Sequence, residues 1–511
     1  MSINKSIAKS AGLIGFATFC SRLLGFARDV VIARLFGVYV YAQAFVIAFR
    51  IPNLFRDFVG EGATNAAFVP VFTQYCAKHT REEFWELANV VLNLLLIILM
   101  AITLLGIIFS PLIVRMIAPG FISDPHKLET TIRLNRIIFP YILLISLTAY
   151  SMGILNSLKH FAVPAFAPCL LNISIIVFAL LFGEGIKGLA LGVLVGGVMQ
   201  LAVQIPVLYK KGFRWVLFRK FQHPAAKIIG RLMLPRMLSS CIYQLNNFVD
   251  SIFGSLAWIV GEGGVAVLYF SYRLILFPLG IFSTSLSQVI LPTFSDQALE
   301  DNYDRLKQTL TFSLRANFFV MLPGSVGFMV LARPIIWTLF GGGRFDVHSA
   351  NITAHALFFY SIGLFAYGAT RILQSCFFAL KDTVTPTKIA ALALGINIFL
   401  NSVLMFPMKI NGIALATSVS GITTSLVLFF ILKKRLSLFN ARAILDSFLR
   451  ILAASLGMGV VCYFVSGISV NKYLNLSFSI ICGVLSYALF CIIFRVSELR
   501  ELWRWLANKR K

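Results

Sequence analysis

The chain has 511 residues, of which 59% are hydrophobic and 13% are charged, and its mean hydropathy is +0.86. Soluble globular chains carry about a quarter charged residues, so this composition excludes an ordinary soluble protein. Unbroken apolar stretches such as 90–109 also exclude an outer-membrane barrel, whose strands alternate apolar and polar residues. We therefore expect an all-α polytopic membrane protein.

Fourteen apolar segments, separated by polar, Gly or Pro residues, are each long enough to cross a hydrocarbon layer about 30 Å thick. The first has no A-x-A cleavage site and is expected to stay in the protein as its first helix. In chain order the segments are 7–36, 41–76, 85–118, 131–157, 161–183, 186–209, 227–259, 264–298, 305–340, 349–380, 385–406, 411–435, 444–467 and 474–497.

The distribution of cations predicts which side each loop faces. An even number of crossings places both termini on one side, and the termini and even-numbered loops hold several-fold more Lys and Arg than the odd-numbered loops. The main clusters are in 210–227, 433–442 and 500–511. The termini are therefore predicted to be cytoplasmic. The net charge of +25 reflects topology, and no nucleic-acid partner is expected.

An internal repeat relates the first six segments to the next six. Its landmarks recur in the same order 222 to 224 residues apart: Pro70 and Pro292, Pro111 and Pro334, Lys159 and Lys381, and Gly188 and Gly412. Because six is even, the two copies share one orientation and are related by a pseudo-two-fold axis along the membrane normal. The last two segments are an addition.

This duplication predicts four parts of the chain and a class of function. They are an N-terminal lobe (1–210), a basic cytoplasmic linker (211–226), a C-terminal lobe (227–436), and two further helices with a basic tail (437–511). Two facing bundles are typical of alternating-access transporters, whose sites lie at mid-membrane between the lobes. The alternative is that the duplication is only a folding unit.

Ionisable residues inside the apolar segments favour a transporter. Each costs about 2.5–3.5 kcal/mol at the bilayer centre, so each one is a candidate functional residue. Arginine binds phosphate with paired hydrogen bonds and stays charged when desolvated, which predicts a pocket for a phosphorylated anion. The alternative for each arginine is an anchor that extends to the interface. The strongest candidates are Arg22, Arg28 and Asp29 in the first segment, Arg56 and Glu61 in the second, and Arg273 in the eighth.

Five sequence strings resemble the MviN/MurJ lipid II flippases, a family of the multidrug/oligosaccharidyl-lipid/polysaccharide exporter superfamily. They are SRLLGFARD (21–29), IPNLFRDFVGEGA (51–63), AFVPVFTQY (67–75), FPYILLISL (139–147) and PAFAPCLLNIS (164–174). The resemblance covers nearly the whole chain. It implies fourteen helices, a central cationic cavity, and a hydrophobic groove lined by the last two helices.

The resemblance also implies a substrate and a set of binding residues. The substrate would be lipid II, an undecaprenyl-pyrophosphate glycopeptide, moved from the inner to the outer leaflet of the bacterial cytoplasmic membrane for peptidoglycan synthesis. The positions that match the family's functional residues are Arg22, Arg28, Asp29, Arg56, Glu61 and Arg273. The sequence departs from the family at Gln43 and Leu276, where many members carry a carboxylate. The expected partners are lipid II, membrane lipids and candidate cell-wall synthesis enzymes, around a monomer.

The sequence suggests one metal site, which would bind an ion whose gradient drives transport. The chain has no GxxxxGK[ST] motif, so energy would come from an ion gradient or the membrane potential. Oxygens of Asp250, Asn397, Asn401 and Thr417 could bind Na⁺. The alternative is that the two asparagines and Thr417 form ordinary hydrogen bonds between helices.

Two other function classes remain open alternatives. A flippase for another polyprenyl-linked oligosaccharide would need the same arginines, because they bind the pyrophosphate and not the sugars. A membrane-embedded polyprenyl-phosphate enzyme would need carboxylate or metal motifs, and the sequence has no HExxH or GxSxG. The chain is therefore predicted not to be an enzyme.

Overall fold

The computed structural model describes residues 3–56, 68–183, 185–216, 223–299, 303–436, 441–468 and 471–499. Of residues 3–11, 55, 56, 234–243 and 247, only the backbone is described. Within these ranges the chain is helical and forms no β-sheet, which confirms the all-α prediction. It divides into two compact units, Met1–Ala257 with Gly343–Phe345 (unit 1) and Trp258–Gly342 with Asp346–Lys511 (unit 2).

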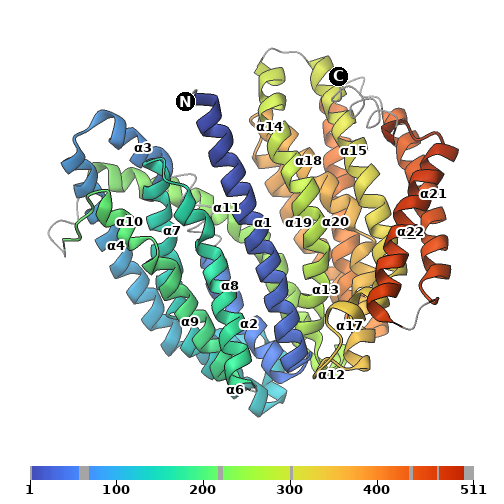
Figure 1. Cartoon of the computed structure of the whole chain (residues 1–511), viewed down its shortest axis with the longest axis horizontal. Helices are drawn as coiled ribbons and strands as arrows, with labels where there is room; N and C mark the ends of the chain where they lie inside the picture. The colour runs from blue at the N-terminus through green and yellow to red at the C-terminus, as the bar shows by residue number, and fades with distance from the viewer. Residues whose placement is uncertain are drawn as a thin grey trace. The chain divides into compact units, whose positions relative to one another are not determined.

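In unit 1, α8 packs against both α9 and α1, and α2 packs against α6 and α7. Figure 1 shows α1 and α8 side by side, in dark blue and teal. The helices are α1 (Ile3–Phe36), α2 (Val40–Arg56), α3 (Val69–Lys78), α4 (Arg81–Ile108), α5 (Ser110–Ile117), η2 (Pro119–Ser123), α6 (Pro125–Ile138), α7 (Tyr141–Ser157), α8 (Ala162–Phe182), α9 (Ile186–Ala202), α10 (Ile205–Lys210) and α11 (Pro224–Ser255).

In unit 2, α19 packs against α20, and α21 packs against both α15 and α22. The two C-terminal helices are therefore joined to the rest of the unit through α15 and, for α22, also through α16. From the unit boundary onward the helices are α12 (Ala257–Val260), α13 (Gly264–Pro278), the π-turn η3 (Leu279–Ser283), α14 (Thr284–Leu299), α15 (Tyr303–Val330), α16 (Ala332–Leu339), α17 (Val347–Ser361), α18 (Leu364–Ala379), α19 (Val384–Met408), α20 (Ile410–Arg435), α21 (Ala441–Val465) and α22 (Lys472–Ile493).

Ten helical segments of the described chain are long and apolar enough to cross a membrane. The number rises to eleven if α17 and α18, which are bent by 43° at their junction, count as one span. This confirms a multi-pass membrane protein, while fourteen crossings stay a prediction. The segments that meet the criterion do not include α1, α2 or α11, which carry the candidates Arg28, Arg56 and Asp250.

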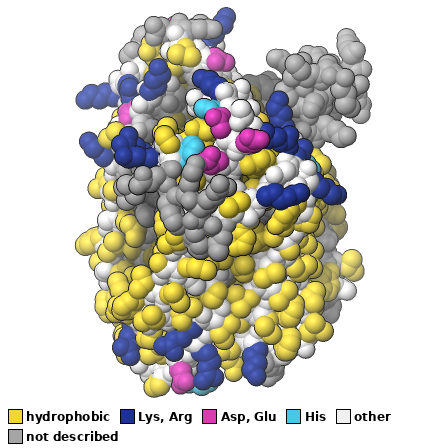
Figure 2. All heavy atoms as spheres, turned by 90° about the vertical axis from the view of Figure 1, so that its left-hand side faces the viewer, with side chains coloured by type: hydrophobic (Ala, Val, Ile, Leu, Met, Phe, Trp, Pro, Cys, Tyr) yellow, Lys and Arg dark blue, Asp and Glu magenta, His cyan; other side chains and the backbone are white. Residues whose placement is uncertain are grey.

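One face of the molecule shows the pattern of a membrane protein directly. In Figure 2, hydrophobic side chains form a broad band, and Lys and Arg side chains gather above and below it. Many large apolar side chains are exposed, for example Leu181 at 72% and Ile108 at 64%. Soluble monomers rarely expose so much apolar surface. Such side chains are suited to face lipid.

Helix bounds recur between the units and support the internal repeat. Helices α4 and α15 both have 28 residues, α5 and α16 both have 8, and each pair begins 222 residues apart. Lys159 and Lys381, also 222 residues apart, both have φ of 58° in the turn after α7 and α18. Positive φ is uncommon for lysine, so its occurrence at both matched positions indicates one repeated turn.

Two predicted segments are each divided in the structure. Segment 85–118 becomes α4 and α5, separated at Phe109, and segment 305–340 becomes α15 and α16, separated at Leu331. Pro111 and Pro334 lie in the first turn of α5 and α16, where a missing backbone N–H costs nothing. The extra length of these two segments is therefore a second short helix.

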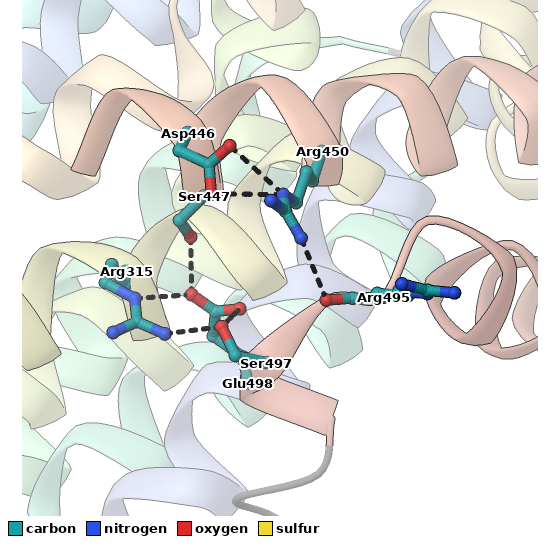
Figure 3. A network of polar contacts seen from close by, with 7 residues as sticks. All are labelled: Arg315, Asp446, Ser447, Arg450, Arg495, Ser497 and Glu498. Atoms are coloured by element: carbon teal, nitrogen blue, oxygen red, sulfur yellow. Dashed lines mark hydrogen bonds and ion pairs between the residues drawn. The ribbon is translucent and has the colours of Figure 1, made fainter. Parts of the chain in front are cut away.

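A buried carboxylate, Glu498, connects the segment that follows α22 to α15 and α21 (Figure 3). Arg315 of α15 donates from Nε to Oε1 of Glu498 at 2.6 Å and from Nη2 to Oγ of Ser497 at 2.7 Å. Ser447 of α21 donates to the same Glu498 oxygen. Burial raises the pKa of Glu498, but hydrogen bonds from Arg315, Ser447 and the backbone, together with the charge of Arg315, outweigh this effect, so the pKa lies below its ordinary value of 4.5.

We expect Glu498→Gln to lower the melting temperature at neutral pH, because it removes the carboxylate that pairs with Arg315 in a largely buried site. The expected loss is about 3 kcal/mol. A carboxylate whose pKa is depressed by folding stabilises above its unfolded pKa, and this stability disappears as the pH falls through the folded pKa. The wild type should therefore lose stability in acid more steeply than the variant.

The matched control is Glu129→Gln, which neutralises a carboxylate that is 76% exposed in its pair with Arg133. Its melting temperature should stay close to that of the wild type, because exposed ion pairs contribute little. Equal melting of Glu498→Gln and wild type at neutral pH would contradict the assignment of Glu498 as a structural anchor.

Candidate functional site

The best-defined candidate residue of unit 1 is Arg28, in the second half of α1. Its side chain is 7% exposed, and that of Asp29 is fully buried. Arg28 donates from Nε and Nη2 to one oxygen of Asp29, Oδ1, at 3.0 and 2.7 Å. The structure therefore places a guanidinium and its counter-ion together inside the unit, as expected for a charge that cannot reach water.

Two further helices contribute to the surroundings of Arg28. Asn172 of α8 accepts a hydrogen bond from Arg28 Nη1 at 3.2 Å. The guanidinium carbon lies 5.7 Å from the ring centroid of Phe49 in α2, within the range of a cation–π contact. Asn172 is not among the site residues predicted from the sequence. The available signal was a polar amide in the middle of an otherwise apolar helix.

The other predicted residues of unit 1 are placed less completely. The side chain of Arg22 is exposed, so it does not share the buried setting of Arg28. Arg56 is the last residue of α2, and its side chain lies outside the described part, as does all of Glu61. Gln43 is buried in α2, at 1% exposure, and no described residue pairs with its Nε2.

In unit 2, Arg273 lies in α13 and is half-buried, and Leu276 follows one turn later. The helix continues through Pro278 into the π-turn η3, where Ser283 donates to Oδ1 of Asn317 at 2.7 Å. Asn317 in turn donates to the carbonyl of Phe365 at 3.1 Å. These bonds hold the end of the Arg273 helix within unit 2. Arg28 belongs to unit 1, so the convergence of the two arginines stays a prediction.

Three of the four predicted cation ligands meet in unit 2. Asn401 donates to Asn397 Oδ1 at 3.0 Å, and Asn397 donates to Thr417 Oγ1 at 3.2 Å, joining α19 to α20. All three are buried. The bond between Asn397 and Thr417 is of the kind that the alternative explanation, hydrogen bonding between helices, requires.

The fourth predicted ligand, Asp250, lies in α11 of unit 1 and is half-buried. Its neighbour Ser251 accepts a hydrogen bond from Arg50 of α2. Among the described residues, no three His, Cys, Asp or Glu side chains gather as metal ligands. The Na⁺ site therefore stays a prediction.

Comparison with known proteins identifies the family to which this chain belongs. The family model described as "Lipid II flippase MurJ" matches residues 32–483. The chain belongs to the lipid II flippase MurJ family. It is 36% identical to the probable lipid II flippase MurJ of Buchnera aphidicola subsp. Acyrthosiphon pisum over 427 residues, which cover 83% of this chain and 82% of the relative. It is 33% identical to the lipid II flippase MurJ of Burkholderia cenocepacia over 426 residues, 82% of each chain.

Solved structures show the same relationship. The chain is similar to a lipid II flippase MurJ in an inward closed conformation, with a TM-score of 0.80 and 29% identity over 94% of this chain and 99% of that one. An inward-facing multidrug resistance MATE family transporter of the MOP superfamily shares the fold, with a TM-score of 0.69 and 18% identity over 82% and 96% of the two chains. The family resemblance indicated by the five sequence strings is confirmed. Membership of this flippase family also confirms the predictions that the protein is a transporter and that it is not an enzyme.

Proposed function

We propose that this protein is a flippase that moves lipid II from the inner to the outer leaflet of the bacterial cytoplasmic membrane. The observation that carries the proposal is Arg28, a guanidinium buried between α1, α2 and α8 and held by Asp29 and Asn172. A buried arginine keeps its charge and can bind a phosphate oxygen through directed N–H groups. Membership of a family named for lipid II flippases gives the substrate.

The pyrophosphate would bind between Arg28, Arg56 and Arg273, with Arg22 and the acidic residues Asp29 and Glu61 around them. The sugar-peptide headgroup would occupy a wet cavity, and the polyprenyl tail would stay in lipid along a groove beside α21 and α22. The polar part of the substrate then never enters hydrocarbon, which removes the main barrier to crossing.

Alternating access would come from two lobes, residues 1–210 and 227–436, joined by the basic linker 211–226, with 437–511 as the added helices. Fourteen crossings would place both termini in the cytoplasm. The recurring bounds of α4 with α15 and of α5 with α16 support a duplicated bundle. Rocking of the lobes would release the substrate outward if the outward-open state holds the anion less tightly.

The coupling ion is a second part of the proposal. Asp250, Asn397, Asn401 and Thr417 would supply oxygen ligands to Na⁺, or the membrane potential alone would drive transport. The buried Asn397–Thr417 contact between α19 and α20 supports a polar position inside unit 2. No resident cofactor is part of the proposal.

The direct test is exchange of labelled lipid II between the leaflets of vesicles that contain only this protein. We expect protein-dependent exchange of lipid II, and faster exchange than for another polyprenyl-pyrophosphate glycan if the headgroup is recognised. A sodium gradient should change the rate in the wild type and not in Asp250→Ala. Exchange no faster than in protein-free vesicles would refute the flippase function.

A further inference from the structure

Asn172 is a polar residue in the middle of a membrane helix that has no charged side chain. Helix α8 is apolar over most of its length, and Asn172 is 7% exposed. An amide in such a position is costly unless its donors and acceptor are satisfied. Asn172 accepts from Arg28 and donates to the carbonyls of Ser21 at 3.2 Å and Pro168 at 3.3 Å. Each polar atom of its side chain is therefore bonded.

The amide contacts α1 at two places that are two helical turns apart. Its oxygen accepts a hydrogen bond from Nη1 of Arg28, and its nitrogen donates to the carbonyl of Ser21, seven residues earlier in the chain. Arg28 donates from Nε and Nη2 to Asp29 of its own helix and from Nη1 to Asn172 of α8. The planar guanidinium is therefore held by hydrogen bonds on two sides. Two edges fix the direction of a planar group, whereas one would let it rotate.

The two acceptors differ in charge, and this difference matters for anion binding. Asp29 balances the guanidinium with a full negative charge, as burial requires. A second carboxylate at position 172 would surround one cation with two anions and repel a phosphate. An amide oxygen accepts the hydrogen bond without adding net charge, so the guanidinium is oriented and its attraction for an anion is retained.

We infer that Asn172 is a positioning residue for substrate binding, which holds the guanidinium of Arg28 in the orientation that receives the pyrophosphate. This inference rests on the proposed function. It gives α8 a part in substrate recognition, although this helix has no charged residue of its own that could bind an anion. Asn172 acts through Arg28, so its effect on binding should disappear when Arg28 is absent.

The test is a double-mutant cycle on the full-length protein, with equilibrium binding of undecaprenyl pyrophosphate as the readout and undecaprenol as the uncharged reference. The variants are Asn172→Leu, Arg28→Gln and the double variant. We expect Asn172→Leu to weaken binding roughly tenfold, the size of one hydrogen bond to a charged group. The double variant should bind no more weakly than Arg28→Gln alone, because the two residues act as one unit.

Asn135→Leu is the matched control, since Asn135 is also buried in unit 1 and donates to Ser110 Oγ at 2.8 Å, and not to the partners of Arg28 or Asn172. It should leave binding unchanged. If Asn172→Leu does not fold, Asn172→Ser replaces it in the cycle, because serine bonds to its own helix and is too short to reach Arg28.

The outcomes separate this inference from the proposed function. If the wild type binds undecaprenyl pyrophosphate and Arg28→Gln binds it measurably more weakly, the proposed site stands. Wild-type affinity in Asn172→Leu, or a loss that adds fully to that of Arg28→Gln, then overturns the role of Asn172 alone. If the wild type binds the pyrophosphate no better than undecaprenol, both the proposed site and this inference are overturned.

Discussion

Replacing Arg28, Arg56 or Arg273 by glutamine should abolish complementation of a strain depleted of its lipid II flippase. Each change removes one charged donor from the proposed pyrophosphate site. A hydrogen bond to a charged group contributes about 1.5–3 kcal/mol, so each loss should lower substrate affinity roughly 10- to 100-fold. Growth after depletion is the measurement, and immunoblots of the membrane fraction show whether each variant still inserts.

Arg133→Gln is the matched control, because Arg133 is 68% exposed and pairs only loosely with Glu129, at 3.5 Å. It should complement like the wild type. Arg28→Lys is informative as well: it keeps the charge but loses the planar fork that Asp29 and Asn172 hold, so we expect partial growth. Normal growth of all three glutamine variants would refute the arginine cluster.

Helix positions could be predicted from the sequence to a large extent, because long apolar segments have few alternatives in a membrane. Where an apolar segment divides could not. Pro111 and Pro334 are visible in the sequence, but a proline can kink a helix or begin a new one, and packing decides between them. In this chain both prolines lie in the first turn of a new helix.

The candidate site was predictable only where its partners are close in sequence. Arg28 and Asp29 are neighbours, and the spacing of Asn397 and Asn401 placed them on one face of α19, where they do form a hydrogen bond. Asn172 is 144 residues from Arg28, and Glu498 is 183 residues from Arg315. Such pairs depend on which helices pack together, and local patterns in the sequence do not show that.

Gly120→Ala should cause a large loss of stability, because a methyl group there would overlap backbone atoms and not a movable side chain. Gly120 is buried in η2, and a Cβ at this position would overlap the carbonyl group of Ser255 at the end of α11. The same substitution would displace the Gly120 N–H from Ser255 Oγ, which accepts it at 3.0 Å. We expect a loss of about 3 kcal/mol or more, seen as a lower melting temperature.

Two controls separate overlap from the lost hydrogen bond. Gly15→Ala places a methyl group on α1 with nothing within 4 Å, and should be neutral or slightly stabilising through helix propensity. Ser255→Ala removes the hydroxyl without adding bulk, at a cost of about 1 kcal/mol. Gly120→Ala melting as high as Ser255→Ala would show that η2 can move away from α11 at little cost.

Gly120→Ala should also affect the candidate coupling residue Asp250, because Gly120 and Asp250 are connected through the C-terminal end of α11. Ser251 and Ser255 are one helical turn apart, and they contact Arg50 of α2 and Gly120 of η2. Asp250 directly precedes Ser251, so its position depends on how this end of α11 is held within unit 1. In the vesicle assay we therefore expect any dependence of lipid II exchange on a sodium gradient to weaken in Gly120→Ala and to persist in Gly15→Ala.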